Sequence, residues 1–202
     1  MRFDLQVIAS WIEEGARVLD LGCGRGDLLE HLAAEKGVRG SGIEVLEERV
    51  AECIARGLSV VQGDINAEIR DYPDQCFDYV VLSQTLQQVF DPAQLIREML
   101  RVGRLGIVSF PNFGYWRIRM QLLMKGRAPV SRELPYQWYD TPNIRVISMK
   151  DFQTFCLTHG FAVRKRTPID TDYHADEGHV LKVLSNVRAT YGIFLLGQAG
   201  GE

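Results

Sequence analysis

The chain has 202 residues, of which 46% are hydrophobic, 24% charged and 9% aromatic, and this composition is typical of globular proteins. A chain of this length buries a core that needs no metal or disulfide to stabilise it, and its four cysteines contain no C-x-x-C pair. No run of 18 apolar residues and no apolar leader occurs, so we expect neither a membrane span nor an export signal. We expect a single domain over residues 1–202, reduced thiols, no metal site and a cytoplasmic location.

The net charge of −3 is spread unevenly along the chain. Residues 1–110 carry 11 basic and 18 acidic side chains, whereas residues 111–150 carry 7 basic and 2 acidic ones. The acidic total gives no general attraction to nucleic acid or anionic lipid, so we expect no nucleic-acid or membrane partner. The stretch from 111 to 150 is a basic segment within an acidic protein.

Apolar runs alternate with amphipathic runs through the first half of the chain, which predicts an α/β fold with a parallel sheet covered by helices. The expected strands are 16–21, 38–43, 58–62, 79–82 and 105–110, and the expected helices are 5–12, 27–36, 46–56 and 92–102. A helix over 115–125 is followed by a stretch rich in proline and aromatic residues, and we interpret about 111–150 as a segment that covers the end of the sheet. Ser148 and Asp151 resemble the capping box of a helix that Gly160 ends. Strands at 161–163 and 193–196 complete the sheet.

A glycine-rich loop follows the first strand. Gly22, Gly24 and Gly26 alternate between an apolar strand and a helix, where glycine lets a ligand approach the main chain closely. A tight turn with no ligand is the alternative. Asp20 directly precedes the loop; its carboxylate would repel a pyrophosphate but suit the ammonium and sulfonium of S-adenosylmethionine. Asp20 would otherwise tie neighbouring loop N–H groups together. A Walker P-loop is absent.

Two further acids follow later strands. Glu44 lies 18 residues beyond Gly26, where nucleotide-binding α/β folds place a carboxylate for the ribose hydroxyls. Asp64 follows the third strand, where its carboxylate is placed to accept from an adenine amino group while Ile65 packs on the ring. Ligands of open α/β sheets bind at these strand ends. The alternative is that both acids are solvated loop residues.

These residues resemble a known family. VLDLGCGRG at 18–26, GIE at 42–44 and QGDIN at 62–66 look like class I S-adenosylmethionine-dependent methyltransferases, and SFPNF at 109–113 and WYDTPN at 138–143 look more narrowly like the MetW family of methionine biosynthesis proteins. The resemblance implies a Rossmann-like, doubly wound sheet of seven mostly parallel strands with an antiparallel last strand. It also implies an S-adenosylmethionine site at Asp20, Gly22, Gly24, Glu44 and Asp64, with S-adenosylhomocysteine as the product. Cys23, Gly26, Ile65 and Ser83 complete the candidate cofactor-binding set.

No catalytic residue can be assigned, because methyl transfer from a sulfonium requires mainly positioning. Ser83, together with Gln84 and Thr85, either orients an acceptor or caps a turn, and Asn112 has the same two interpretations. In the basic segment, arginines and aromatic residues are interleaved, a mixture that is enriched in binding surfaces. Candidate substrate or partner residues here are Tyr115, Trp116, Arg117, Arg119, Tyr136, Trp138 and Tyr139, beside Lys125, Arg127 and Arg132. A lid for an anionic substrate, a docking face for a protein, and buried tryptophans beside solvated arginines all remain open.

Two hypotheses follow from the residues and the resemblance. In the first, the protein is a small-molecule methyltransferase of methionine biosynthesis that acts in or with the homoserine O-acyltransferase step on an unknown acceptor. In the second, it is a non-catalytic, cofactor-sensing accessory or regulatory subunit of homoserine O-acyltransferase. The resemblance implies this acyltransferase as the partner in both, and both require S-adenosylmethionine binding.

Overall fold

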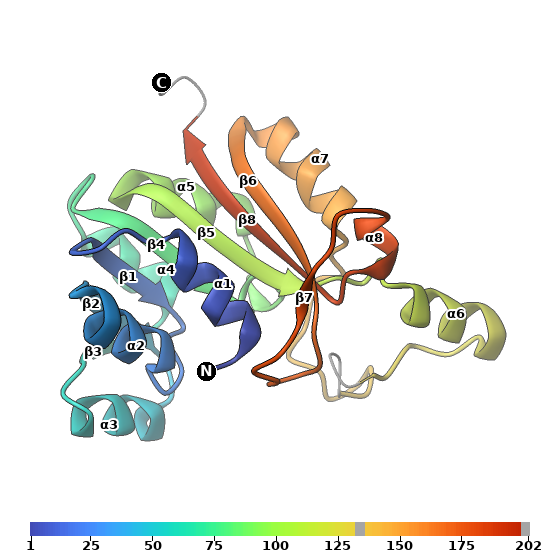
Figure 1. Ribbon diagram of the computed structural model, residues 1–202, viewed down its shortest axis with the longest axis horizontal. Coiled ribbons are helices and arrows are strands. Elements are labelled where there is room, and N and C mark those ends of the chain that lie inside the picture. Colours follow the sequence, from blue (N-terminus) through green and yellow to red (C-terminus); the bar gives the residue numbers. More distant parts are fainter. Residues whose placement is uncertain (132–135, 199–202) are drawn as a thin grey trace.

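A computed structural model describes residues 1–131 and 136–198, and it shows an α/β fold built on one mixed sheet (Figure 1). The strand order is β3-β2-β1-β4-β5-β8-β6-β7. The first five strands are parallel to one another, and β8 inserts antiparallel between β5 and β6. The expected fold class and the antiparallel last strand are therefore confirmed. The sheet has an eighth strand beyond the expected seven, the two-residue β7 at its edge.

The elements follow the predicted alternation. The strands are β1 Arg17–Leu21, β2 Arg39–Glu44, β3 Ser59–Gln62, β4 Phe77–Ser83, β5 Gly103–Pro111, β6 Phe161–Asp170, β7 His179–Val180 and β8 Tyr191–Gln198. The helices are α1 Phe3–Trp11, α2 Asp27–Lys36, α3 Glu47–Ala55, α4 Ile65–Glu68, α5 Pro92–Val102, α6 Trp116–Lys125, α7 Met149–His159 and α8 Ser185–Arg188, with short 3-10 turns η1 Ile69–Asp71 and η2 Leu86–Gln88. The predicted capping box at Ser148 and Asp151 is present, and Gly160 ends α7 in the left-handed conformation.

Helices cover both faces of the sheet (Figure 1). Each face has its own apolar core. On one face, α1 and α2 bury Leu5, Ile8 and Leu32 against alternate strand residues such as Val18 and Val81. On the other face, α5 and α7 pack on the intervening strand residues; Phe110, Phe152 and Phe194 form its aromatic centre, with ring centroids 4.8–5.6 Å apart. Because strand side chains alternate between faces, each strand residue can be assigned to one of the two layers.

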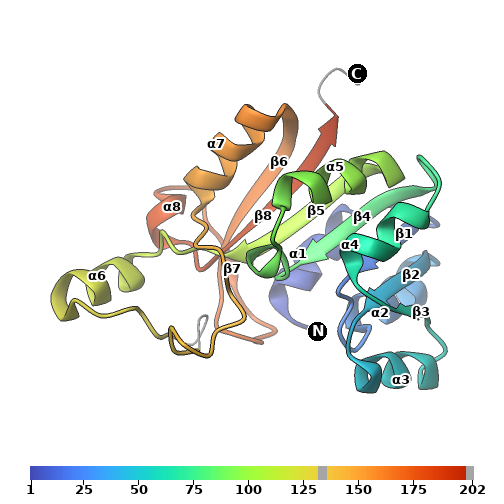
Figure 2. The same ribbon diagram turned by 180° about the vertical axis from the view of Figure 1, so that it is seen from behind.

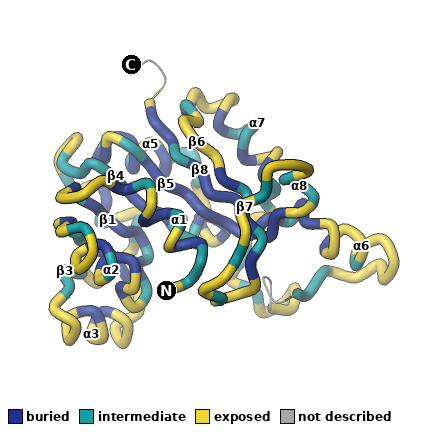
Figure 3. The backbone as a smooth tube through the Cα atoms, in the orientation of Figure 1, coloured by how far each residue is buried: buried dark blue, intermediate teal, exposed yellow. Residues whose placement is uncertain are grey.

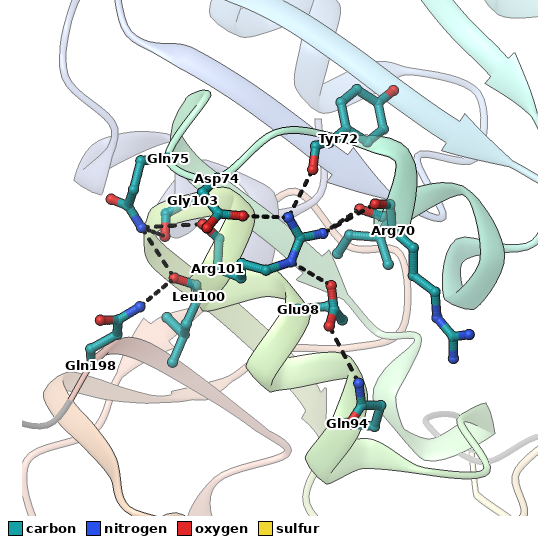
Figure 4. A network of polar contacts seen from close by, with 11 residues as sticks. Arg70, Tyr72, Asp74, Gln75, Gln94, Glu98, Leu100, Arg101, Gly103 and Gln198 are labelled. Atoms are coloured by element: carbon teal, nitrogen blue, oxygen red, sulfur yellow. Dashed lines mark hydrogen bonds and ion pairs between the residues drawn. The ribbon is translucent and has the colours of Figure 1, made fainter.

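A polar network fixes the carboxyl end of α5, directly before the start of β5 (Figure 4). All five N–H donors of the Arg101 guanidinium are used: by the carboxylates of Glu98 and Asp74 and by the carbonyls of Ile69, Arg70 and Tyr72. Gln75 and Gln198 donate to the last carbonyls of the helix, including that of Leu100. The network therefore joins α5 to η1 and β8, and it satisfies helix-terminal groups that would otherwise lack partners.

One helix of the basic segment, α6, points away from the sheet. In Figures 1 and 2, α6 extends away from the body beyond the carboxyl end of β5. Ile118 is its only buried residue, and Figure 3 shows most of the helix as exposed. This helix is therefore an extension, whereas the later part of the segment returns to the body, where the N–H groups of Ile144 and Arg145 both donate to the carbonyl of Gln87 in η2. The expectation that about 111–150 covers the end of the sheet stays a prediction. Arg132 lies outside the described residues.

Candidate functional site

The glycine loop begins where β1 ends. Gly22 and Cys23 both donate backbone hydrogen bonds to the carbonyl of Ile43, at 2.8 and 3.1 Å, which ties the loop to β2. All three glycines have left-handed φ angles, and a side chain at Gly24 would meet no atom within 4 Å. At Gly26, by contrast, a Cβ would lie 2.3 Å from Leu58 Cδ1. Gly24 thus borders open space that a ligand can enter, whereas Gly26 is required by the packing of α2 against α3 and β3.

Asp20 is the strongest indication of a ligand at this loop. Its side chain is buried, and its Oδ1 atom has no hydrogen-bond partner. Burial raises the pKa of Asp20 to about 7; the charge of Arg2 opposes this shift and that of Glu44 adds to it. A buried carboxyl oxygen without a partner is costly unless a ligand group satisfies it. The alternative, that the Asp20 carboxylate only accepts hydrogen bonds from neighbouring loop N–H groups, does not explain why its Oδ1 atom has no partner.

Glu44 is held rigidly at the end of β2. Its Oε2 atom accepts from the N–H of Gly24 at 2.9 Å, and its Oε1 atom accepts from Val45 and Leu46 at 3.0 and 3.1 Å. It is buried, so it is not a solvated loop acid. Since a carboxylate has about four acceptor positions, roughly one remains for a ribose hydroxyl in this arrangement. The expectation that both hydroxyls bind Glu44 at once therefore requires one of the backbone bonds to be released.

The remaining candidate cofactor residues differ in what they offer. Asp64 is exposed, and its Oδ1 atom caps α4 by accepting from the N–H and side-chain amide of Asn66 at 2.8 Å, while Ile65 packs against the core. The Cys23 side chain packs with Leu29 and Cys53, and burial raises the pKa of its thiol. Only the main chain of Cys23 is thus placed to contribute. Ser83 Oγ lies 3.1 Å from Ser109 Oγ, at the carboxyl ends of β4 and β5.

The candidate substrate residues do not gather around one point. Asn112 is fully buried and uses both amide hydrogens and its oxygen on backbone groups of residues 114, 149, 186 and 189. Its polar capacity is filled, so it holds the scaffold. Thr85 donates to the carbonyl of Ser83 at 3.0 Å, as the turn-capping interpretation predicts. Tyr115 is buried, whereas Trp116, Tyr136, Trp138 and Tyr139 are exposed.

The arginines of α6 have different surroundings. Arg119 Nε donates to the carbonyl of Gly114 at 2.6 Å and stabilises the start of the helix. The Arg117 guanidinium lies 5.5 Å from the centre of the Trp116 ring. Exposed tryptophans at 116 and 138 are inconsistent with the interpretation that both belong to the core.

A polar group lies beside Asp20 and Ser83, and two of its three residues, Arg2 and Asp4, were not singled out by the sequence. Arg2, Asp4 and Gln84 come from the start of α1 and the turn after β4, and Gln84 donates to Asp4 at 2.7 Å. Gln84 has a φ of 52°, unusual for a residue with a side chain. No local pattern reveals this group, because it depends on how α1 docks on the sheet.

Neither a metal cluster nor a membrane helix is found in the described part of the chain. No three His, Cys, Asp or Glu side chains of residues 1–131 and 136–198 are grouped to hold a metal ion. No helix in the same residues combines the length and apolar character needed to cross a bilayer.

Comparison with known proteins decides the family. The model of the family described as "Methionine biosynthesis protein MetW" matches residues 2–196. The chain belongs to the MetW family. The expectation from its sequence motifs is thereby confirmed, and the family is one described as methionine biosynthesis proteins.

Three individual matches agree with this assignment and with the fold. The "Bifunctional methionine biosynthesis protein MetXA/MetW" of Rhodopirellula baltica is 38% identical over 160 residues, which are 75% of this chain and 26% of that protein. A demethylmenaquinone methyltransferase of Listeria monocytogenes is 33% identical over 121 residues, 52% of this chain and 50% of the enzyme. The chain therefore spans about a quarter of the length of the first relative and half of the length of the second. A solved S-adenosylmethionine-dependent methyltransferase of Thermotoga maritima, titled a possible histamine N-methyltransferase, superimposes with a TM-score of 0.70 at 18% identity, covering 96% of this chain and 87% of that one. This match shows the class I methyltransferase fold.

Proposed function

We propose that this protein binds S-adenosylmethionine at the carboxyl ends of β1, β2 and β3 and acts in methionine biosynthesis at the homoserine O-acyltransferase step. The observation that carries the binding proposal is the buried Asp20 Oδ1, which has no partner within the protein although it adjoins the open backbone of the glycine loop. A cationic ligand at this point would satisfy the carboxylate. The methyltransferase fold and the family both support this assignment.

The residues present fit such a ligand in a definite order. The sheet order β3-β2-β1 brings Asp64, Glu44 and Asp20 to the carboxyl ends of three neighbouring strands: Asp20 lies in β1, Glu44 ends β2, and Asp64 follows β3 by two residues. Asp64 has one carboxylate oxygen outside its helix cap for the adenine amino group, Glu44 has about one acceptor position for a ribose hydroxyl, and Asp20 is left for the ammonium. When bound, S-adenosylmethionine supplies an electrophilic methyl group. The protein's own part in transfer is to hold that group in line with an acceptor.

Calorimetric titration with S-adenosylmethionine tests the site. Gly24→Val fills the open space beside the loop, and Glu44→Ala removes the carboxylate; we expect each to weaken binding by at least about tenfold, or 1.4 kcal/mol. Gly15→Val is the matched control, because Gly15 also has a left-handed φ and open space around it but lies before β1 at the other end of the strand. Unchanged affinity in both site variants, or an equal loss in the control, would refute the site.

A second function is favoured by the fused relative and by the exposed helix α6: an accessory or regulatory subunit of the acyltransferase. The Rhodopirellula baltica protein joins a MetXA part and a MetW part in one chain, which keeps the two at a high effective concentration. In this chain α6 exposes Leu122, Leu123 and Met124 beside basic residues. Contiguous apolar surface of this kind is typical of interaction sites.

Turnover separates the two functions. The purified protein, alone and mixed with homoserine O-acyltransferase, would be assayed for S-adenosylhomocysteine over a broad acceptor screen, and the acyltransferase rate would be measured in parallel. Formation of S-adenosylhomocysteine supports the enzyme. A changed acyltransferase rate without formation of S-adenosylhomocysteine supports the regulatory subunit. If S-adenosylhomocysteine does not form and the acyltransferase rate does not change, a role at this step is rejected.

A further inference from the structure

A buried polar cluster joins the start of α1 to the ends of the central strands. In the sheet register Asp20 pairs with Val81, and Ser83 follows Val81 by two residues, so Asp20 and Ser83 belong to the same face. Ser83 pairs in turn with Ser109 on β5. α1 packs on this face of the sheet. The polar residues at the carboxyl ends of its strands therefore lie next to the first residues of the chain.

Arg2 is fixed at this end by contacts with two elements. Its Nε and Nη2 atoms lie 3.2 and 3.3 Å from the two carboxylate oxygens of Asp4, and Nη2 is 3.5 Å from Ser83 Oγ. Asp4 is itself buried and receives the Gln84 amide at 2.7 Å. The Arg2 side chain keeps 24% of its surface exposed, compared with 3% for Asp4. The guanidinium is thus held in place while part of it stays accessible.

Arg2 lies near Asp20 without pairing with it. Its positive charge is close enough to favour the ionised form of Asp20, yet their charged atoms form no ion pair within 4.0 Å, and Asp20 Oδ1 has no partner. A cation and an anion at one end of this face offer one partner for each charged group of an α-amino acid: a guanidinium binds its carboxylate, and a carboxylate binds its ammonium.

The strand order places Arg2 next in line after the three acids that are proposed to bind the cofactor. Asp64, Glu44 and Asp20 lie at the carboxyl ends of the neighbouring strands β3, β2 and β1, and the next strand is β4, whose Ser83 contacts Arg2. A ligand with its adenine at β3 and its ribose at β2 therefore directs its amino-acid end toward Asp20 and Arg2. We propose that Arg2 binds the carboxylate of the amino-acid part of S-adenosylmethionine while Asp20 receives its ammonium, so that this protein selects adenosyl ligands that carry a complete amino acid. The inference rests on the proposed cofactor site.

Calorimetry with matched ligands tests this inference. The ligands are S-adenosylmethionine and its decarboxylated form, which keeps the ammonium and sulfonium but lacks the carboxylate. We expect the unaltered protein to prefer the complete ligand by about tenfold or more, and Arg2→Met to lose most of this preference by weakening only the complete ligand. Arg2→Lys keeps the positive charge but lacks the paired N–H donors of the guanidinium, so it should retain only part of the preference for the complete ligand. Arg39→Met, at the exposed amino end of β2, is the control.

The outcomes separate this inference from the proposed function. If the unaltered protein binds both ligands equally, or if Arg2→Met weakens both to the same degree while it unfolds at the unaltered urea midpoint, Arg2 does not read the carboxylate and only this inference fails. If the unaltered protein binds neither ligand, the cofactor site itself is refuted, and this inference falls with it.

Discussion

At the residue scale, burial of the Asp20 carboxyl group makes the stability of the fold depend on pH. Burial raises its pKa to about 7, above the value of about 3.9 that an unfolded chain gives. Between about pH 4 and pH 7 the folded chain therefore holds a proton that the unfolded chain has released, so stability falls as the pH rises. Asp20→Asn keeps the shape and removes this ionisation.

We expect Asp20→Asn to become more stable relative to the unaltered protein as the pH rises. The difference between their free energies of unfolding in urea should grow by about 2–4 kcal/mol from about pH 4 to pH 8 in the absence of ligand. The same variant should lose affinity for S-adenosylmethionine, since the ammonium loses its ionic partner. Other titrating groups are common to both proteins and cancel. A difference that stays constant with pH would show that Asp20 ionises as freely as in the unfolded chain.

At the element scale, the end of α5 depends on Arg101 (Figure 4). Arg101 belongs to α5, and its side chain donates to the carbonyls of Ile69, Arg70 and Tyr72 at the end of η1. It is the residue of this network that links the helix to η1. Removing it leaves several partly buried acceptors without donors.

We expect Arg101→Ala to reduce the free energy of unfolding by about 2–3 kcal/mol, because charge-assisted hydrogen bonds are lost together with their geometry. Arg101→Lys should restore only part of this, since one ammonium cannot reach both carboxylates and three carbonyls. Arg97→Ala, an exposed arginine on the same helix, is the matched control in urea unfolding. A loss in Arg101→Ala no greater than in Arg97→Ala would contradict the structural role.

The elements also show where sequence patterns suffice. Strands β1, β4 and β5 were predictable because parallel strands covered on both faces are largely apolar runs. β2 and the exposed edge strand β3 are more polar, and they were predictable from their places between amphipathic helices. The pattern predicted only 161–163 of β6, since Arg164, Lys165 and Arg166 are exposed and a register shift lies between Val163 and Lys165. β7 was missed because two residues carry no periodicity.

At the scale of the whole molecule, the site was predictable only in part. The acids at the ends of β1, β2 and β3 could be found because parallel strands bring their carboxyl ends to one edge. The hydrogen bonds of these acids could not be predicted from the sequence, because the backbone bonds of Glu44 and the helix cap at Asp64 depend on local loop conformations. Arg2 lies 81 residues from Ser83 in the chain, and their contact follows only from the docking of α1.

The exposed apolar side chains of α6 lead to the last prediction. If the MetW family chain docks on homoserine O-acyltransferase through residues 111–150, apolar side chains that the free protein leaves in water are buried in the complex. Leu123 and Met124 are 79% and 77% exposed, so replacing both with glutamate leaves the fold intact. Arg119 is unsuitable for charge reversal, because it also holds the start of the helix.

We expect Leu123→Glu with Met124→Glu to abolish co-purification with the acyltransferase while S-adenosylmethionine still binds, because the new carboxylates would have to be desolvated at the interface. Leu157→Glu is the matched control, since Leu157 is an 82% exposed leucine on α7, on the body of the molecule. Recovery of the complex from the double variant in the same yield as from the control would exclude α6 as the docking face. Loss in both would indicate that charge anywhere on the surface disrupts the complex, and would equally remove the case for α6.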